Sequence, residues 1–362
     1  MDIPPLAEVR KRTEKKRDAW WTVLLVDPVA TPLVRWTAKW TRATPNQITW
    51  AALFIGLGAA ACFARGDWEW LALGAVLYHV SFILDCMDGK LARLTGKGSV
   101  FGAWLDYIFD RVRVLACSVA LMGGQYSKTG EVIYVWLALA VVFLDMLRYL
   151  DALEIFKVRH NMRKQIRAQV KRARAANSVQ GPEGSELAFM EDLLREDPEA
   201  EDQTEEQAEE QAGKALVQPG STVNETLTAS TAETSEDGPA EAKPKKKREV
   251  VDLHVEFKSR FPWYGRIRSF FLRHRIRTHL VSGIEFQMAV FIIGPLVGAI
   301  IPVTIGAGVL LFLFELAIIY KLLLSTRDFG RTMAAFQIPE TAVQIPPQQT
   351  QDPAAESTTK VS

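Results

Sequence analysis

Four aspartates in two neighbouring helical segments are the residues of this sequence best suited to chemistry. Asp85 and Asp88 are three positions apart and Asp106 and Asp110 are four apart, so each pair shares one face of a helix. If the two helices are antiparallel neighbours, all four carboxylates point into one space. Four anions at a membrane boundary repel one another and are costly to desolvate, so the sequence predicts a positive charge between them.

The residue types around this cluster favour metal-assisted phosphoryl chemistry. Aspartate oxygens suit hard divalent cations such as Mg²⁺ or Mn²⁺, and the cluster contains no His or Cys that would favour zinc. Two such ions can neutralise phosphate oxygens and stabilise the attacking and leaving oxygens together. Gly89 and Gly102 permit close approach of a ligand or a second helix, and Arg93 can bind a phosphate with two hydrogen bonds. Isolated acids elsewhere in the apolar blocks, among them Asp145 and Glu315, are interpreted as buried hydrogen-bond partners.

The elements that must position these residues are apolar blocks. The net charge of +1 alone would suit a soluble protein, but the apolar residues are clustered and the acidic surplus lies between residues 183 and 241. Six blocks have about the length needed to cross a bilayer. They run from about 48 to 64, 68 to 84, 101 to 122, 132 to 150, 283 to 301, and from after Pro302 to near Leu324.

The segment before the first block has a different character. Residues 1 to 19 are basic, Trp20 and Trp21 follow, and residues 23 to 40 are too polar and too broken by prolines to cross a bilayer. Tryptophans at headgroup level and basic residues facing anionic lipid are typical of an interfacial amphipathic helix, although a soluble helix is the alternative. The expected fold is therefore all-α integral membrane, with six transmembrane helices, an N-terminal interfacial amphipathic helix and a disordered cytoplasmic insertion.

The insertion separates the fourth and fifth blocks. Its start, Lys157 to Arg174, is basic and predicted to be helical, whereas residues 177 to 243 lack the apolar residues to form a core and are predicted to be disordered. The basic run from Lys243 to Arg248 is expected to meet anionic lipid, not nucleic acid, and residues 251 to 279 suggest a second interfacial segment. The expected divisions are 1–44, 45–156, 157–282, 283–325 and a polar tail at 326–362.

Lysine and arginine counts predict the orientation. With six spans both termini lie on one side, and that side holds nearly all the basic residues of the short flanks, whereas the opposite loops hold only Arg65 and Lys128. The termini, the aspartates and the insertion are therefore expected to be cytoplasmic. A bacterial cell membrane is the expected location.

The motif from Asp85 to Asp110 resembles the signature of the CDP-alcohol phosphotransferase family. It reads D-x2-D-G-x2-A-R-x8-G-x3-D-x3-D, and all eight fixed residues are present. The resemblance implies six transmembrane helices after an interfacial helix, and two bound Mg²⁺ or Mn²⁺ ions. The long insertion departs from the family pattern, and this limits what the resemblance implies about the acceptor side.

The resemblance also implies roles for individual residues. Asp85 and Asp106 would bridge the two ions, Asp88 would complete one site, and Asp110 would complete the other and act as general base. Nucleotide contacts would come from a turn before the first span and from positions in and after the motif; these residues are Thr44, Pro45, Asn46, Gln47, Gly89, Ala92, Arg93 and Ser99. A Thr-Pro turn is also an ordinary helix start, so this part of the match is less specific.

The expected function is transfer of a phosphoalcohol group from a CDP-alcohol to a hydroxyl acceptor with release of CMP, in phospholipid biosynthesis. CDP-diacylglycerol is the expected donor, with glycerol 3-phosphate, inositol phosphate or serine among the acceptors. Transfer from CDP-choline or CDP-ethanolamine to a lipid is the alternative within the family. Outside it, a cation transporter would also place carboxylates in a membrane, and a membrane anchor with an inactive enzyme body is a third reading.

An anionic acceptor would need cations near Asp110. Arg148, Arg275 and Arg277, at the cytoplasmic ends of the helices, are the candidates, although terminal arginines are commonly membrane anchors. The expected partners are the CDP-alcohol donor, the acceptor and membrane lipids, with no nucleic acid. A homodimer is one assembly compatible with this architecture.

Overall fold

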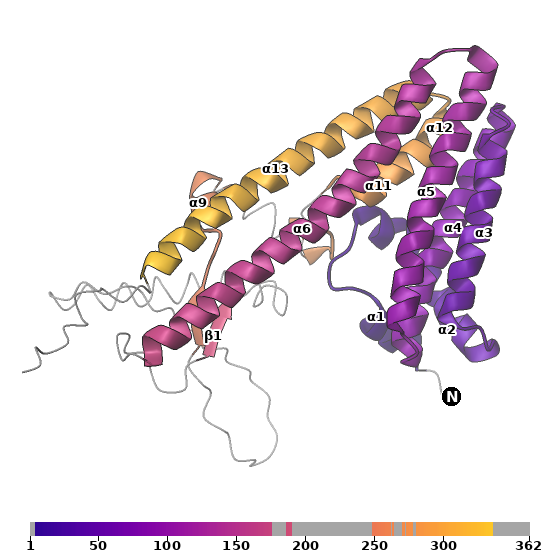
Figure 1. The fold of residues 1–362 in the computed structure, drawn as a ribbon. Coiled ribbons are helices and arrows are strands. Elements are labelled where there is room, and N and C mark those ends of the chain that lie inside the picture. The colour runs from indigo at the N-terminus through magenta and orange to yellow at the C-terminus, as the bar shows by residue number, and fades with distance from the viewer. Residues whose placement is uncertain are drawn as a thin grey trace, which may run out of the picture.

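The computed structural model describes residues 4–175, 186–189, 248–261, 263, 270–271, 273–277 and 280–335. Helices make up most of the regular structure (Figure 1). In chain order the elements are α1 (Leu6–Thr13), η1 (Thr22–Val26), α2 (Asp27–Trp40), α3 (Pro45–Phe63), α4 (Trp68–Thr95), α5 (Val100–Thr129), α6 (Ile133–Ala175), β1 (Glu186–Phe189), β2 (Arg248–Val251), α9 (Val255–Arg260), α11 (Gly283–Met288), η2 (Ala289–Ile293), α12 (Gly294–Val297) and α13 (Ile300–Ala335).

Helices α3, α4 and α5 pack together as a bundle. Small residues allow the close approach: a Cβ atom on Gly124 of α5 would lie 2.5 Å from the backbone oxygen of Phe63 at the end of α3. The apolar core of this bundle includes Phe63, Ala75 and Leu121. The bundle therefore fixes α4 and α5, which carry the aspartates, relative to each other.

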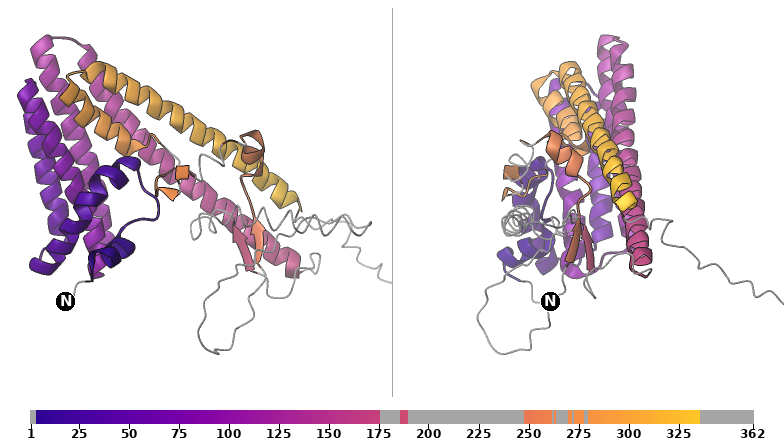
Figure 2. Two further views of the ribbon diagram at one scale, coloured as in Figure 1. Left: turned by 180° about the vertical axis from the view of Figure 1, so that it is seen from behind. Right: turned by 90° about the vertical axis from the view of Figure 1, so that its left-hand side faces the viewer.

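Helices α6 and α13 are much longer than the blocks predicted for them. They pack against each other and extend away from the α3–α5 bundle (Figure 2). The fourth block was expected to end at 150, but α6 continues to Ala175 because residues 151–175 contain no Gly or Pro and are rich in strong helix formers. The basic segment expected to be helical is thus part of the same helix.

The break between the fifth and sixth blocks lies earlier than expected. The chain turns at Gly298, which has a φ of 68° and ends α12, and α13 begins at Ile300. Pro302, predicted to separate the blocks, lies in the first turn of α13, where a proline leaves no hydrogen bond unmade. The fifth block is itself divided into α11, the π-helical turn η2 and α12.

Among the residues that the structure describes, four helices are long and apolar enough to cross a membrane: α3, α4, α6 and α13. This identifies an integral membrane protein. Helix α5 carries more charged residues in its first half, and the apolar segment Gly283–Val297 is shorter. The expectation of six spans therefore stays a prediction for these two elements.

The N-terminal segment folds against α4. Helix α2 buries Ala30 and Val34 and exposes Trp36 and Trp40, so it has two distinct faces. A helix is present where one was predicted, and its position at a membrane interface stays a prediction.

The described part of the insertion contains a small parallel sheet. Strands β1 and β2 pair, and Phe189 of β1 is buried with Ile166 and Val170 of α6 and with Leu253. Residues 186–189 thus differ from the prediction of disorder over 177–243, because Phe189 supplies an apolar anchor on α6. Residues 176–185 and 190–247, which include the rest of that segment and most of the basic run, lie outside the described residues.

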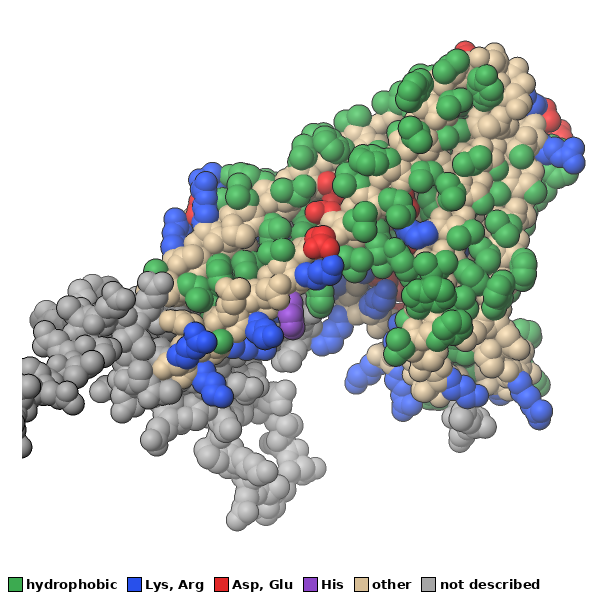
Figure 3. All heavy atoms as spheres, in the orientation of Figure 1, with side chains coloured by type: hydrophobic (Ala, Val, Ile, Leu, Met, Phe, Trp, Pro, Cys, Tyr) green, Lys and Arg blue, Asp and Glu red, His purple; other side chains and the backbone are tan. Residues whose placement is uncertain are grey.

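The second interfacial segment, predicted over residues 251–279, is described only in part. Its helix α9 packs against α13. In the orientation of Figure 3, hydrophobic side chains cover the upper parts of the helices, and Lys and Arg side chains gather toward their lower ends.

Candidate active site

The α4–α5 hairpin brings the two aspartate pairs together. Helix α4 ends at Gly96, whose φ of 68° suits a glycine, and α5 begins after Ser99, whose Oγ accepts the N–H of Gly102 at 2.9 Å. This short connection makes α4 and α5 run in opposite directions, and both helices pack against α3 (Figure 1).

Contacts place three of the four carboxylates where α3, α4 and α5 meet. Asp85 and Asp110 both contact the guanidinium of Arg113. Asp88 is only 5% exposed and its Oδ2 accepts a hydrogen bond from Thr49 Oγ1 of α3 at 2.5 Å. Asp85, Asp88 and Asp110 thus lie where α3, α4 and α5 meet.

Arg113 is the positive charge between the pairs, and the sequence analysis missed it. Its side chain is 2% exposed, with Nη1 3.3 Å from Asp85 Oδ1 and Nη2 2.5 Å from Asp110 Oδ1. Gly56 makes room for it, since a Cβ there would lie 2.7 Å from Arg113 Cδ. The available signal was its spacing of three residues from Asp110, which places both side chains on one face of α5.

Arg111 joins the cluster to two further helices. Its guanidinium pairs with Asp110 and with Asp145 of α6. Asp145 Oδ1 in turn accepts from Gln287 Nε2 of α11 at 2.8 Å, and Gln287 Oε1 accepts from the Tyr78 hydroxyl at 3.1 Å. Asp145 is therefore a buried partner, as expected of an isolated acid, but it belongs to the network around Asp110.

The donor atoms of the cluster suit a hard divalent cation, because all of them are carboxylate oxygens. In the part of the chain that the structure describes, however, no three His, Cys, Asp or Glu side chains converge closely enough to hold one ion. Both oxygens of Asp110 and one of Asp85 point to guanidinium groups. Asp85, Asp88, Asp106 and Asp110 are the residues that would hold Mg²⁺ or Mn²⁺, and Asp85 and Asp110 would first have to turn from these arginines.

The start of α3 lies against the start of α5. Thr44 and Gln47 form a capping box at the start of α3. Both side chains therefore stabilise the helix start, as expected if this turn is an ordinary helix start. Asn46 faces α5: its Oδ1 lies 2.8 Å from where a Cβ on Gly102 would be, and Ser99 Oγ lies 3.0 Å from the same point. Asn46, Ser99 and Gly102 are thus brought together beside the aspartates.

Gly89 leaves an open face on α4. A Cβ there would have Arg93 Nη1 as its nearest neighbour, at 3.7 Å. Arg93 is exposed and Ala92 is half-buried. This face has room for a flat or phosphorylated group, with one guanidinium next to it.

The three arginines suggested for an anionic acceptor are paired elsewhere. Arg148 binds Glu315 of α13, Arg275 binds Glu14 and Asp27, and Arg277 lies 3.4 Å from Asp18. The arginines that contact Asp110 are Arg111 and Arg113.

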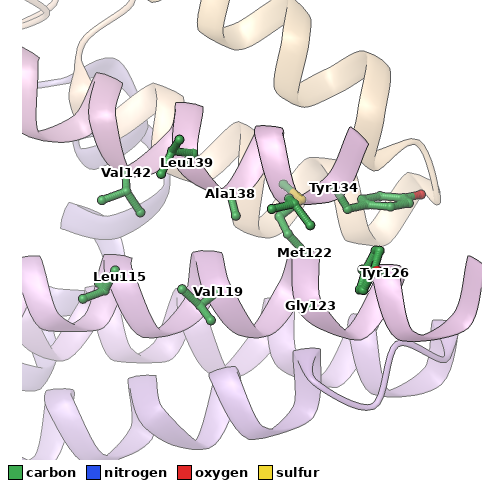
Figure 4. Close-up of a pocket in the computed structure, with 10 residues that line it drawn as sticks. Leu115, Val119, Met122, Gly123, Tyr126, Tyr134, Ala138, Leu139 and Val142 are labelled. Atoms are coloured by element: carbon green, nitrogen blue, oxygen red, sulfur yellow. The ribbon is translucent and has the colours of Figure 1, made fainter. Parts of the chain in front are cut away.

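A cavity of ≈ 350 Å³ between α5 and α6 is separate from the aspartate cluster (Figure 4). Apolar and aromatic side chains line it, among them Val119, Met122 and Tyr126 of α5 and Tyr134 and Leu139 of α6. With no charged group in its lining, this cavity offers nothing for phosphate chemistry.

Comparison with known proteins decides the family of the central helices. The residues from 42 to 177 match the family model described as CDP-alcohol phosphatidyltransferase. Residues 42–177 form a CDP-alcohol phosphatidyltransferase domain. The CDP-alcohol phosphatidyltransferase domain contains α3, α4, α5 and α6, and hence the aspartate cluster, Arg111, Arg113 and Asp145.

Curated relatives of this domain are named as synthases and transferases. A phosphatidylinositol phosphate synthase of Cutibacterium acnes is 35% identical over 100 residues, 27% of this chain and 43% of the relative. A CDP-diacylglycerol–glycerol-3-phosphate 3-phosphatidyltransferase of Cereibacter sphaeroides is 35% identical over 103 residues, 28% of this chain and 43% of the relative. A bifunctional IPC transferase and DIPP synthase of Aquifex aeolicus is 39% identical over 70 residues, 19% of this chain and 15% of the relative. The chain thus spans less than half the length of each of these relatives.

Proposed function

We propose that this chain transfers a phosphatidyl group from CDP-diacylglycerol to the hydroxyl of a small acceptor and releases CMP, in phospholipid biosynthesis. The observation that supports the proposal is the contact of Arg113 with Asp85 of α4 and Asp110 of α5, one from each aspartate pair, together with the open face at Gly89. The printed name of the Cereibacter sphaeroides relative, which includes CDP-diacylglycerol, favours that donor over CDP-choline or CDP-ethanolamine.

In this proposal the acceptor oxygen attacks the phosphorus that carries diacylglycerol. The bond from that phosphorus to the oxygen of CMP breaks, and the hydroxyl proton passes to a carboxylate oxygen of Asp110. Two Mg²⁺ or Mn²⁺ ions at Asp85, Asp88, Asp106 and Asp110 would neutralise charge on the phosphate oxygens. The donor's nucleotide would lie along Gly89, Ala92 and Arg93 toward Asn46 and Ser99, with Thr44, Pro45 and Gln47 holding that end of α3.

The ion pairs of Arg111 and Arg113 support a role for Asp110 at the reacting centre. Both oxygens of this carboxylate are already oriented by guanidinium groups from its own helix. With Asp85 and Asp110 holding metal, the same two guanidinium groups would be available to phosphate oxygens of the donor or of an anionic acceptor. This makes Arg111 and Arg113 better acceptor-side candidates than Arg148, Arg275 and Arg277.

The proposed membrane arrangement has six crossings. Helix α5 and the apolar segment Gly283–Val297 join the four long apolar helices because they pack against them within one bundle. The basic residues near the aspartate end of the helices favour a cytoplasmic active site, with α2 at the membrane surface. A bacterial cell membrane is the proposed location.

The test is transfer by the purified chain. CDP-diacylglycerol labelled in its CMP part, with Mg²⁺ or Mn²⁺, is supplied together with one acceptor at a time: glycerol 3-phosphate, inositol phosphate or serine. We expect labelled CMP and one new phospholipid with one of these acceptors, and neither when a chelator removes the metal. Transport of the divalent cation across the membrane of vesicles that contain the protein, without release of CMP, would instead support a cation transporter.

A further inference from the structure

Four charged side chains join the N-terminal segment, the motif helix α4 and the chain before α11. Lys90, inside the motif, has its Nζ 2.5 Å from Asp27 Oδ1 at the start of α2, and these side chains are 5% and 7% exposed. Asp27 Oδ2 lies 3.3 Å from Arg275 Nη2, and Arg275 Nη1 lies 2.7 Å from Glu14 Oε2. We call Glu14, Asp27, Lys90 and Arg275 the N-terminal latch.

The backbone around Arg275 is fixed as well. Asp18 N–H donates to the Arg275 carbonyl at 3.0 Å, and Arg277 N–H donates to the Asp18 carbonyl at 2.9 Å. Arg275 itself has a φ of 61°, a conformation that non-glycine residues adopt rarely and keep only where surrounding contacts hold them. The end of the insertion is therefore docked on the N-terminal segment at a defined position.

The latch extends to Arg93. The Arg93 Nε donates to the carbonyl of Thr13 at 3.0 Å, and Thr13 precedes Glu14, which Arg275 and Thr31 both hold. With Nε engaged, the guanidinium directs Nη1 over the open face of Gly89. Lys90, next to Gly89, is fixed at the same time by Asp27 and by Thr31.

We propose that Arg275 is a positioning residue through which the end of the insertion sets the affinity of the site for the donor nucleotide. This inference rests on the proposed function, because it takes the open face at Gly89 as the binding site of the donor nucleotide. Arg275 binds Glu14 and Asp27. Glu14 fixes the position of the neighbouring Thr13, and Asp27 fixes Lys90. The Thr13 carbonyl in turn orients Arg93. Loosening Arg275 lets Arg93 leave the Gly89 face.

The experiment measures binding of labelled CDP, with Mg²⁺, to the full chain in detergent, alongside the KM values for CDP-diacylglycerol and for the acceptor. Arg275→Gln is compared with Arg275→Lys and with Arg273→Gln, which removes the same charge at an exposed position two residues away. We expect Arg275→Gln to weaken CDP binding about tenfold, the size of one charge-assisted contact, and to raise the donor KM alone. Arg275→Lys should be intermediate, and Arg273→Gln should match the parent.

A double-mutant comparison tests whether Arg275 acts through Glu14. Glu14→Gln should weaken CDP binding in the same direction, and the double variant Glu14→Gln with Arg275→Gln should lose less than the product of the two single effects. Thermal unfolding of each variant separates this from a general loss of structure. Equal CDP affinity in Arg275→Gln and Arg273→Gln overturns the inference, as does an effect on the acceptor KM alone.

The two proposals fail in different ways. If CDP binding depends on Arg275 but no CMP is released from any CDP-alcohol, the proposed function is wrong and the role of the N-terminal latch in nucleotide binding still stands. If the chain transfers the phosphatidyl group and neither CDP binding nor the donor KM depends on Arg275, the role of the latch is wrong and the proposed function still stands.

Discussion

Arg113 shows how the protein manages the repulsion among its own aspartates. A guanidinium that is 2% exposed lies between Asp85 and Asp110, so part of the charge compensation comes from the chain itself. Removing one partner of a buried ion pair leaves an uncompensated charge, which costs about 3–5 kcal/mol.

Replacing Arg113 by Met should therefore lower the free energy of unfolding by about 3–5 kcal/mol. Thermal unfolding in detergent micelles measures this. Lys128→Met is the matched control. Lys128 is on the same helix as Arg113, α5, but its ion pair with Asp67 is exposed, so breaking that pair should cost less than about 1 kcal/mol. Equal effects of the two substitutions would show that Arg113 does not compensate the cluster.

At the level of residues, spacing predicted the aspartates but not their arginines. Asp85, Asp88, Asp106 and Asp110 form periodic pairs that any helix would place on one face, and the structure brings one member of each pair, Asp85 and Asp110, to the same guanidinium. Arg111 and Arg113 depend on which side chains α4 and α6 bring to α5, which is tertiary information. The same holds for Arg275, whose partners Glu14 and Asp27 are distant in sequence.

Among the elements, the short hairpin between α4 and α5 and the tight α3–α5 packing determine the site. The helix positions followed from apolar blocks, but their ends did not: α6 runs on because nothing in residues 151–175 stops it, and the chain breaks at Gly298 where the left-handed turn needs a glycine. Hydrophobicity reports where a membrane could lie, whereas helix ends depend on local backbone chemistry.

Two adjacent glycines of α5 test the packing. Gly124→Ala would place a Cβ 2.5 Å from a backbone oxygen of Phe63, so we expect a loss of about 1–3 kcal/mol from overpacking. Gly123→Ala meets nothing within 4 Å and should be neutral or more stable by up to about 1 kcal/mol through helix propensity. Unfolding of both variants in the same detergent is the measurement, and equal stabilities would contradict the close approach of α3 and α5.

For the whole molecule, the domain of residues 42–177 accounts for the aspartate cluster, and the rest of the chain surrounds it. Gln287 of α11 reaches Asp145, and the N-terminal segment reaches Lys90 and Arg93. Elements outside the family match thus contact Asp145 on α6 and the motif residues Lys90 and Arg93 on α4.

The acidic part of the insertion is expected to be dispensable for transfer. Deleting residues 192–243 keeps β1 and β2 and removes sequence that lacks apolar residues to form a core, so specific activity should stay within a few-fold of the parent. Initial rates of CMP release measure this. A folded deletion variant without activity would show that this sequence takes part in the site.

The central claim is that the aspartate cluster performs the transfer, and Asp110→Asn tests it most directly. CMP release from CDP-diacylglycerol is measured with the responding acceptor, together with CDP binding, for Asp110→Asn, Asp85→Asn and the exposed control Asp67→Asn. We predict that Asp110→Asn loses at least about 10²-fold in rate while it still binds CDP, that Asp85→Asn loses turnover altogether, and that Asp67→Asn matches the parent. Turnover of Asp110→Asn near the parent rate would contradict the account.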